Sequence, residues 1–423
     1  MVFVIFYNFD TIRIHDRAIF YKSERSEIFP YEGPCMNVFK IFFYGLLVLA
    51  IGAIQADFSF PHLFNLYSPN VGIDLGTQNT SVCVCQKNGQ IKIVANFPSV
   101  IAIDVRSRQV IAHGIKAKEM LGKSPDHLIP IRPLQDGVIK DFPATKAMLR
   151  YIFDVATNYQ PGLLYGPLMI IGVPCSVTDP DVRSIHEIAE KTGAREIYTI
   201  MEPMAAAIGA GLAVEKAKGW MIVDIGGGTT DVMVISLRSP VVSHAIRVAG
   251  DEIDRSIVEY VWKKYNVRIG EQTAEEIKMA IGAAYINESD EVLSMQIGGM
   301  HGSSERLRTI TLTSDDIIEA CEECVQSIFA AIRDVLNNTP VALATDIAEN
   351  GILLVGGGAN LRGLDKRIER EIGLKVTIPK DPMQAVINGI GKVLKNLDYY
   401  RDSLYTKTMV MDFHRLAITN RRN

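Results

Sequence analysis

Residues 71–84 read VGIDLGTQNTSVCV and place an aspartate, a glycine and several hydroxyl and amide side chains between two apolar strands. Residues 221–235 read MIVDIGGGTTDVMVI and repeat the arrangement. A single hairpin of this kind is unremarkable, because a glycine turn between two apolar runs is enough to form it. Two hairpins of one pattern, with Asp74 and Asp224 each ending the first strand, predict a duplicated site.

The two turns have the chemistry of a phosphate-binding site. Backbone N–H groups that converge in a tight turn bind phosphate without bulk, and glycine lets the backbone approach closely. Carboxylates beside phosphates would repel them, so Asp74 and Asp224 are expected to hold Mg²⁺ through water, although each aspartate alone would also suit capping of its own turn. The expected donors are Gly76, Thr77, Gln78 and Asn79 in the first turn, and Gly226, Gly227, Gly228 and Thr229 in the second.

Two further segments extend this prediction to the nucleoside and to the attacking water. A third glycine loop at 353–363, LLVGGGANLRG, follows an apolar strand, and Glu276 and Lys278 in the helical segment 274–285 suit ribose hydroxyls. A solvated helix face would explain those two side chains nearly as well. Glu202, just before Pro203, suits the first position of a helix, where it either orients a water for hydrolysis or serves only as a helix-start acid.

Alternation of strands and helices predicts two similar α/β units with a cleft between them. Segment 91–104 is expected to be a strand and 116–122 to be helical, while the polar tail from Asp398 is expected to be solvated. The net charge of −4 and a pI near 6.1 lack the basic footprint that nucleic-acid binding requires. Six scattered cysteines favour a reduced chain, and Cys321 and Cys324 fall in an amphipathic helical segment rather than in a paired zinc motif.

The N-terminus contains an uncharged run of 14 residues at 41–54, IFFYGLLVLAIGAI. A membrane-spanning helix needs about 20 apolar residues, so this run is short. Three interpretations stay open: a cleaved signal peptide beginning at Met36, a membrane anchor, or residues translated from a start assigned too far upstream. An intracellular nucleotide site favours the last two.

Several motifs in a fixed order resemble a known family. VGIDLGTQNT, DIGGGTTDV and LLVGGGANL are similar to the two phosphate loops and the adenosine loop of the superfamily of actin, sugar kinases and DnaK-type chaperones. PSVIAID, IRPLQDGVIKDF, MEPMAAAIGAGL and EEIKMAIGAAY narrow this resemblance to the MreB family, bacterial actins of rod-shaped cells. The likeness extends from about Val71 to Leu397.

The resemblance implies an α/β, actin-like ATPase fold with two duplicated, RNase H-like lobes around an ATP cleft. It further implies a weak, Mg²⁺-dependent ATPase that polymerises with itself into paired protofilaments. These would lie on the inner, cytoplasmic face of the membrane and direct cell shape and peptidoglycan synthesis with RodZ-, MreC- and MreD-like proteins. The expected parts are an N-terminal extension 1–70; subdomain IA, 71–103, 146–211 and a return at 387–400; IB, 104–145; IIA, 212–251 and 313–386; IIB, 252–312; and a polar tail 401–423.

The resemblance also assigns residues. Glu202 and Thr229 match the pair that holds the catalytic water, and Leu164 and Tyr165 fall in the place of a membrane-inserting loop. By composition alone, Leu-Leu-Tyr beside glycine and proline is equally compatible with packing into the core. Nucleotide contacts other than the two phosphate loops are Glu275, Glu276, Ile277, Lys278, Gly356, Gly357, Gly358, Ala359 and Asn360.

Three positions depart from the family pattern, and three other functions compete. Gln78 replaces a usual alanine, Asp231 a usual glutamate, and Asn360 a usual apolar residue; none removes a motif. A DnaK-type chaperone would need a further substrate-binding domain after the second lobe. A sugar or acetate kinase would need an acceptor pocket with an aspartate base, and a plasmid-segregating actin would need a basic surface for its DNA adaptor.

Overall fold

The computed structural model describes residues 68–86, 88–157, 166–302 and 306–407. The apolar run at 41–54, the predicted membrane residues Leu164 and Tyr165, and the tail from 408 onward lie outside the described residues. Within the described ranges, no helix is long and apolar enough to cross a bilayer. The described residues all belong to one compact unit.

Two five-stranded sheets of the same topology form the centre of this unit. Their strand orders are β10-β9-β1-β2-β3 and β18-β17-β11-β12-β13. In each sheet the first three strands of that order run parallel and the remaining pairs are antiparallel, so the second sheet repeats the first strand for strand. The strands are β1 (Asn70–Leu75), β2 (Asn79–Cys85), β3 (Ile91–Pro98), β9 (Leu168–Val173), β10 (Glu196–Met201), β11 (Trp220–Ile225), β12 (Thr230–Ser236), β13 (Ser239–Ile246), β17 (Ile352–Val355) and β18 (Val376–Thr377).

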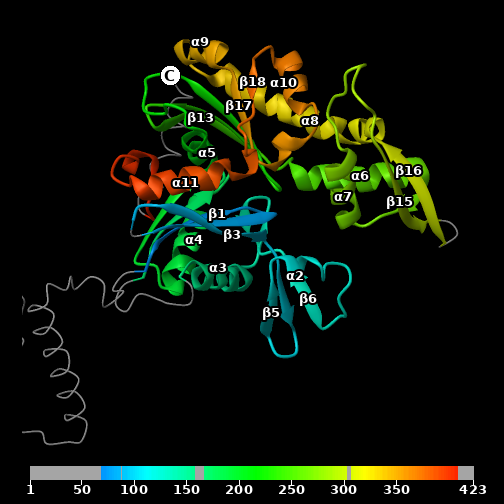
Figure 1. Cartoon of the computed structure of the whole chain (residues 1–423), viewed down its shortest axis with the longest axis horizontal. Coiled ribbons are helices and arrows are strands. Elements are labelled where there is room, and N and C mark those ends of the chain that lie inside the picture. The colour runs from blue at the N-terminus through cyan, green and yellow to red at the C-terminus, as the bar shows by residue number, and fades with distance from the viewer. Residues whose placement is uncertain (1–67, 87, 158–165, 303–305, 408–423) are drawn as a thin grey trace, which may run out of the picture. The chain divides into compact units, whose positions relative to one another are not determined.

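Two helices, α5 (Glu202–Ala210) and α11 (Ala385–Lys395), lie between the sheets (Figure 1). Their apolar side chains share one buried cluster with inward-facing residues of both sheets, including Ile170 and Ile222. The two helices touch backbone to backbone, because a Cβ atom on Gly389 would lie 1.8 Å from the Ala205 carbonyl oxygen. This close crossing joins the lobe built on the first sheet to the lobe built on the second.

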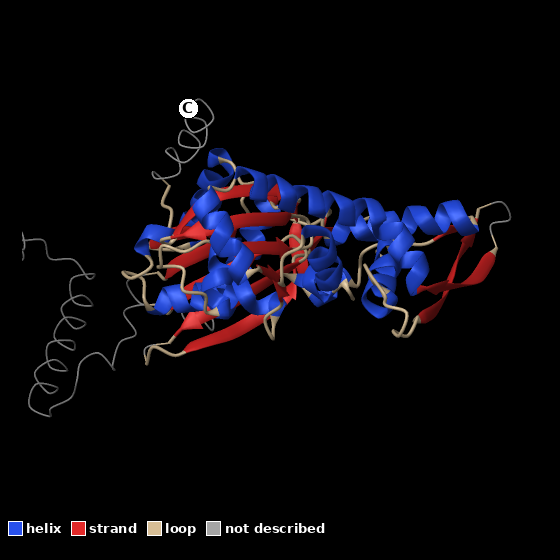
Figure 2. Cartoon of the chain, turned by 90° about the horizontal axis from the view of Figure 1, so that it is seen from above, coloured by secondary structure: helices blue, strands red, loops and turns tan. Residues whose placement is uncertain are grey.

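The outer faces of the two large sheets are covered by helices of each lobe (Figure 2). Strands covered on both faces are apolar throughout, as β9 is, because both of their surfaces are removed from water. The outer helices begin and end at recognisable caps; α4, for example, has Thr178 at its N-cap and ends at Gly193 in the left-handed conformation. These outer helices are α3 (Phe142–Ala156) and α4 (Asp179–Thr192) on the first lobe, and α8 (Ser314–Asn338), α9 (Val341–Asn350) and α10 (Leu364–Ile372) on the second. The helices α6 (Gly250–Tyr265) and α7 (Glu271–Ile281) pack on each other and on α8, beside the smaller sheet of the second lobe (Figure 1).

Each lobe also carries a smaller three-stranded sheet. The sheet β5-β4-β6 with the short helix α2 (Ile115–Lys118) belongs to the first lobe, and the sheet β14-β15-β16 belongs to the second. A two-stranded turn, β7-β8, lies beside the first sheet's carboxyl edge. These strands are β4 (Ile101–Asp104), β5 (Gln109–His113), β6 (Leu128–Ile131), β7 (Leu134–Gln135), β8 (Val138–Ile139), β14 (Val267–Arg268), β15 (Ser294–His301) and β16 (Leu307–Thr313), and single turns of 3₁₀ helix occur at η2 (Gly357–Asn360), η3 (Pro382–Gln384) and η4 (Arg401–Ser403).

The structure differs from the sequence expectations in two places. The strand expected over 91–104 is broken between β3 and β4, because the buried Ser99 donates its hydroxyl to the Gly76 carbonyl oxygen (2.6 Å) and turns the chain into another sheet. The tail expected to be solvated is packed as far as Tyr405. Leu404 is buried, and Tyr405 exchanges backbone hydrogen bonds with Thr199 on the open edge of β10.

Candidate functional site

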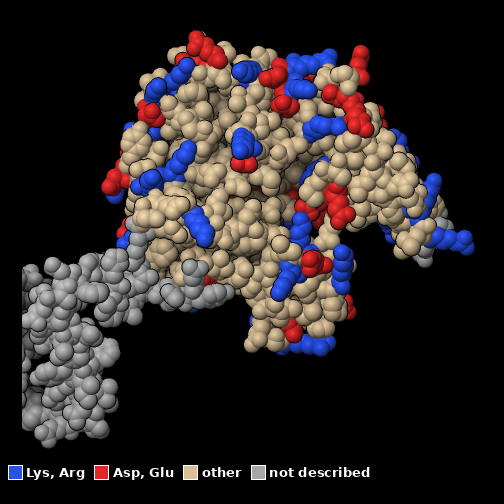
Figure 3. Space-filling view, in the orientation of Figure 1, with Lys and Arg blue, Asp and Glu red and all other residues tan. Residues whose placement is uncertain are grey.

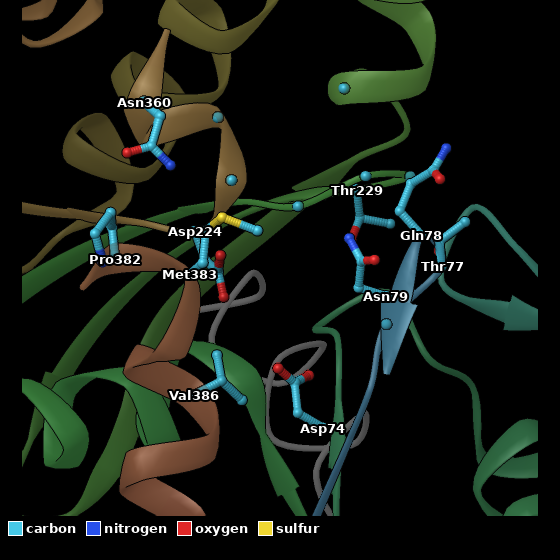
Figure 4. Close-up of a pocket in the computed structure, with 18 of the residues that line it drawn as sticks. Asp74, Thr77, Gln78, Asn79, Asp224, Thr229, Asn360, Pro382, Met383 and Val386 are labelled. Carbon is cyan, nitrogen blue, oxygen red and sulfur yellow. The ribbon is translucent and has the colours of Figure 1, made fainter. Parts of the chain in front are cut away.

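A cavity of about 430 Å³ lies where the two hairpin turns face each other (Figure 4). The turn after β1 contributes Thr77, Gln78 and Asn79 on one side, while η2 and η3 contribute Asn360 and Met383 on the other. The sequence-predicted residues that line it are Asp74, Gly76, Thr77, Gln78, Asn79, Glu202, Asp224, Gly226, Gly227, Gly228, Thr229, Glu275, Lys278, Gly356, Gly357, Gly358 and Asn360.

The first turn is held by hydrogen bonds to two neighbouring segments of the chain. The buried Thr77 accepts a hydrogen bond at its hydroxyl oxygen from the Gly137 N–H (3.1 Å), and Ser99 donates to the Gly76 carbonyl oxygen. These hydrogen bonds thus fix the loop, and residues 76–79 line the cavity. A preorganised loop of this kind binds an anion without a further loss of its own conformational entropy.

The glycines of the second turn are required by space. A Cβ atom on Gly227 would lie 2.3 Å from Cγ of Gln78, and one on Gly228 would lie 3.0 Å from Cα of Asp136. The turn closes through a hydrogen bond from the Gly226 N–H to the Thr229 carbonyl oxygen (2.9 Å). Glycine therefore lets the two lobes' loops approach each other more closely than any other residue would.

Three carboxyl groups line the floor of the cavity, those of Asp74, Glu202 and Asp224, and the buried Asp231 lies close to Glu202 and Asp224 without lining it. Burial raises the pKa of Asp74 to about 7. Burial first, and then the neighbouring carboxylates, raises the pKa values of Glu202 and Asp224 well above their ordinary range. Asp231 has a partner, since its Oδ1 accepts a hydrogen bond from the Cys175 N–H (2.6 Å), although burial raises its pKa as well.

This donor set fits a hard divalent cation. Carboxylate oxygens are the ligands that Mg²⁺ prefers, and a cation beside buried carboxylates favours their charged forms. Asp74 and Asp224 occupy equivalent strand ends in the two lobes, and both line the cavity. The crowding of acids that is otherwise costly is therefore consistent with a cation and phosphates between them.

Glu202 lies at the first position of α5, directly after β10. Met201 is the N-cap residue and Pro203 fills the next position, which suits a helix start because proline lacks an N–H. The small residues behind it, Ala205 and Ala206, are fully buried and hold the helix against the sheet. The carboxyl group is thus presented to the cavity from a rigid element.

The helix α7 contributes only one of its faces to the cavity. Lys278 donates to the Gly250 carbonyl oxygen (2.9 Å) and to Asp254 (2.8 Å), and Glu275 forms an ion pair with Lys118 (2.7 Å). Glu276 is exposed on the other side of the helix, and Ile277 is fully buried in the second lobe's core. Ala359 is likewise buried, so Glu276, Ile277 and Ala359 do not line the cavity.

Several lining residues were missed by sequence reasoning. Gly137 follows Asp136 in an Asp-Gly turn, a signal that was visible within IRPLQDGVIKDF. Met279 and Met383 leave 70% and 50% of their surface exposed and give one end of the cavity an apolar lining. No periodic pattern marks the methionines, since their role depends on which helices meet. The remaining missed residues include Asn96, Pro174, Gly250, Ile253, Gly282, Leu361, Pro382 and Val386.

The duplicated lobes with a glycine-lined cavity between them define an actin-like α/β fold, as the sequence predicted. MreB5 of Spiroplasma citri, solved with AMPPNP, superimposes with a TM-score of 0.74 at 33% identity and covers 79% of this chain and 98% of its own. The MamK double helical filament superimposes with a TM-score of 0.62 at 21% identity, covering 78% of this chain and 98% of its own, and supports the fold alone.

Sequence comparison defines the family more narrowly. The MreB/Mbl protein family matches residues 68–402. The cell shape-determining protein MreB of Escherichia coli strain K12 is 42% identical over 346 residues, which cover 81% of this chain and 98% of that protein. Mbl of Bacillus subtilis strain 168 is 40% identical over 333 residues, covering 79% and 98%. The chain belongs to the MreB/Mbl family of cell shape-determining proteins.

Proposed function

We propose that this chain binds and hydrolyses ATP with Mg²⁺ and assembles with itself into paired filaments on the inner face of the cell membrane. There it would direct cell shape and peptidoglycan synthesis together with RodZ-, MreC- and MreD-like proteins. The observation that carries the proposal is the glycine-lined cavity with buried carboxylates at its floor. Support also comes from Spiroplasma citri MreB5, which has been solved bound to AMPPNP and bound to ADP.

The roles of the residues follow from their positions. The backbone N–H groups of 76–79 and 226–229 would bind the phosphates, and Lys278 would contact the ribose hydroxyls. Asp74 and Asp224 would hold Mg²⁺ through water, and the cation would supply charge neutralisation in the transition state. Glu202, in its charged form, would orient the attacking water and accept its proton, with the Thr229 hydroxyl as a second anchor.

The two five-stranded sheets and the two three-stranded sheets support a division into four subdomains with the boundaries expected from sequence. Under this proposal β5-β4-β6 forms subdomain IB and β14-β15-β16 forms subdomain IIB. The helix α11 would complete subdomain IA, because it packs on β1, β2 and β9 of the first sheet. Membrane attachment through Leu164 and Tyr165, or through the run at 41–54, is part of the same proposal.

Replacing Glu202 with glutamine tests the catalytic assignment. The substitution keeps the shape but removes the base, so ATP hydrolysis should fall about 100-fold or more while ATP still binds. Glu196→Gln on the exposed start of β10 is the matched control and should leave turnover unchanged. Unchanged turnover in Glu202→Gln would contradict the role of this residue.

Electron microscopy on lipid tests the assembly. Filaments should form on vesicles of anionic lipid with ATP and should be sparse without it. A Leu164→Ser, Tyr165→Ser protein should still form filaments but fewer of them on lipid, and a protein beginning at Asp57 tests the apolar run in the same way. ATP binding without filaments under all conditions would favour a kinase-like enzyme instead.

A further inference from the structure

Three side-chain contacts bridge the two lobes at the mouth of the cavity. Lys118, the last residue of α2 in the first lobe, forms an ion pair with Glu275 on α7 in the second lobe (2.7 Å). The Gln272 side chain on the same α7 donates to the Lys118 carbonyl oxygen (2.8 Å). Nearer the phosphate loops, the Gln78 side-chain amide donates to a carboxylate oxygen of Asp251, at the start of α6.

These contacts join parts of the chain that no backbone pairing connects. Lys118 and Glu275 are 157 residues apart in sequence, and Gln78 and Asp251 are 173 apart. In the space-filling view, acidic side chains on one side of the gap and basic side chains on the other face each other (Figure 3). At the mouth, the lobes are therefore tied by one ion pair and two hydrogen bonds, each of which uses at least one side chain.

The contacts lie in partly buried surroundings, where they are stronger than ordinary surface pairs. The Lys118 and Glu275 side chains keep only 26% and 20% of their surface exposed. Ion pairs that are shielded in this way lose less to solvent screening than exposed pairs do. The Gln78 stem is wedged against Gly227, where a Cβ atom would lie 2.3 Å away, so its amide has little freedom before it meets Asp251.

On another side of the cavity, where Val386 of α11 lines it, the lobes are joined by packed helices. The α5–α11 crossing ties the lobes through backbone contact, so any opening must occur by rotation about that crossing and must separate the mouth. Glu275 and Gln78 both line the cavity while their partners Lys118 and Asp251 lie outside its lining. A molecule leaving the cavity on this side has to part these pairs.

We propose that Gln78, Lys118, Asp251, Gln272 and Glu275 form a clasp that holds the mouth closed and limits the rate of nucleotide exchange. The inference rests on the proposed function, since it names a regulation of the same site. Breaking the clasp shifts the population toward the open cleft, and release through the open state speeds up in proportion. The ion pair makes the rate sensitive to ionic strength.

A charge swap in the full-length chain tests the clasp. Release of a fluorescent ATP analogue should be about fivefold faster in Lys118→Glu than in the wild type, because attraction becomes repulsion. Lys116→Glu, on the exposed side of the same helix, makes the same change in charge and should leave release unaltered. Added salt should accelerate release from the wild type but not from Lys118→Ala. Equal release rates in Lys118→Glu and Lys116→Glu would overturn the proposal.

Hydrogen–deuterium exchange in the nucleotide-free chain provides a second measurement that does not depend on ATP. The amides of 226–229 should exchange faster in Lys118→Glu and return toward the wild-type rate in Lys118→Glu, Glu275→Lys, where the pair is restored with reversed charges. Failure of the swap to restore protection would overturn the clasp. If the wild type binds no ATP, the proposed function fails, while the exchange rates still decide whether the clasp exists.

Discussion

The lobes meet at two junctions, and the contacts at these junctions differ in kind. At the α5–α11 crossing, Gly389 and Gly209 allow backbone to touch backbone, and apolar side chains surround the contact. At the mouth, the contact consists of side chains such as Lys118 and Glu275 that retain some access to water. Packed backbones resist displacement, whereas polar side chains exchange one partner for water at little cost. The first junction is suited to be a hinge and the second a closure.

The largest loss of stability should appear when a methyl group is added at the α5–α11 crossing. Gly389→Ala would place a Cβ atom 1.8 Å from the Ala205 carbonyl oxygen, so one helix must move. We expect the free energy of unfolding to fall by about 3 kcal/mol or more, measured by urea denaturation. Gly298→Ala in β15, where nothing lies within 4 Å of the added atom, is the control and should change stability by less than about 0.5 kcal/mol. Equal effects would mean that the crossing is loosely packed.

The stability comparison has to be made at one fixed pH, because a buried histidine of the first lobe makes stability depend on pH. His186 on α4 is 2% exposed, its Nε2 has no hydrogen-bond partner among the described residues, and burial lowers its pKa to about 4. Between pH 7 and pH 5 the unfolded chain therefore binds a proton at His186 that the folded chain does not, so the contribution of His186 to stability decreases as the pH is lowered. The expected loss is about 2 kcal/mol relative to His186→Leu, which lacks this titration. Parallel pH profiles of the two proteins would remove His186 as the cause.

The smallest effect on stability should come from the mouth. Lys118→Ala removes a partly exposed ion pair, and we expect the free energy of unfolding to fall by less than about 1 kcal/mol at pH 7. The same protein should nevertheless release nucleotide faster. A loss as large as that of Gly389→Ala would show that the mouth supports the fold and does not merely close it.

Much of the central architecture was predictable because the two hairpins carry their pattern locally. Alternation and apolar runs identified the strands from Val71 and from Met221, and glycine marked the loops that face the cavity. Tertiary packing determined which side chains line the cavity and which face the core, and the local sequence pattern did not reveal this. Ile277 and Ala359 were assigned to the site through resemblance, yet their side chains face the core because the neighbouring sheet fixes which side of each element is buried.

The periodicity of the sequence could not predict contacts between side chains that are far apart in the chain. The Lys118–Glu275 pair depends on how two separate small sheets are placed, and neither residue stands out in its own segment. The break at Ser99 was missed for a related reason, since its hydroxyl bonds to Gly76 and Thr80, which belong to another hairpin. The tail was misjudged because its polar composition hides Leu404, which fills a gap in the core between the lobes.

The pairing of Tyr405 with Thr199 matters for anyone who wishes to label this protein. The edge of β10 would otherwise present unpaired backbone groups to neighbouring molecules, and open edges recruit strands from other chains. A fluorescent fusion that replaces the chain after Arg401 would uncover this edge and also remove the hydrogen bond from Ser403 to the Arg238 carbonyl oxygen. Aggregates seen with such a fusion would result from the truncation, so a tag joined beyond Lys407 is the safer design for imaging.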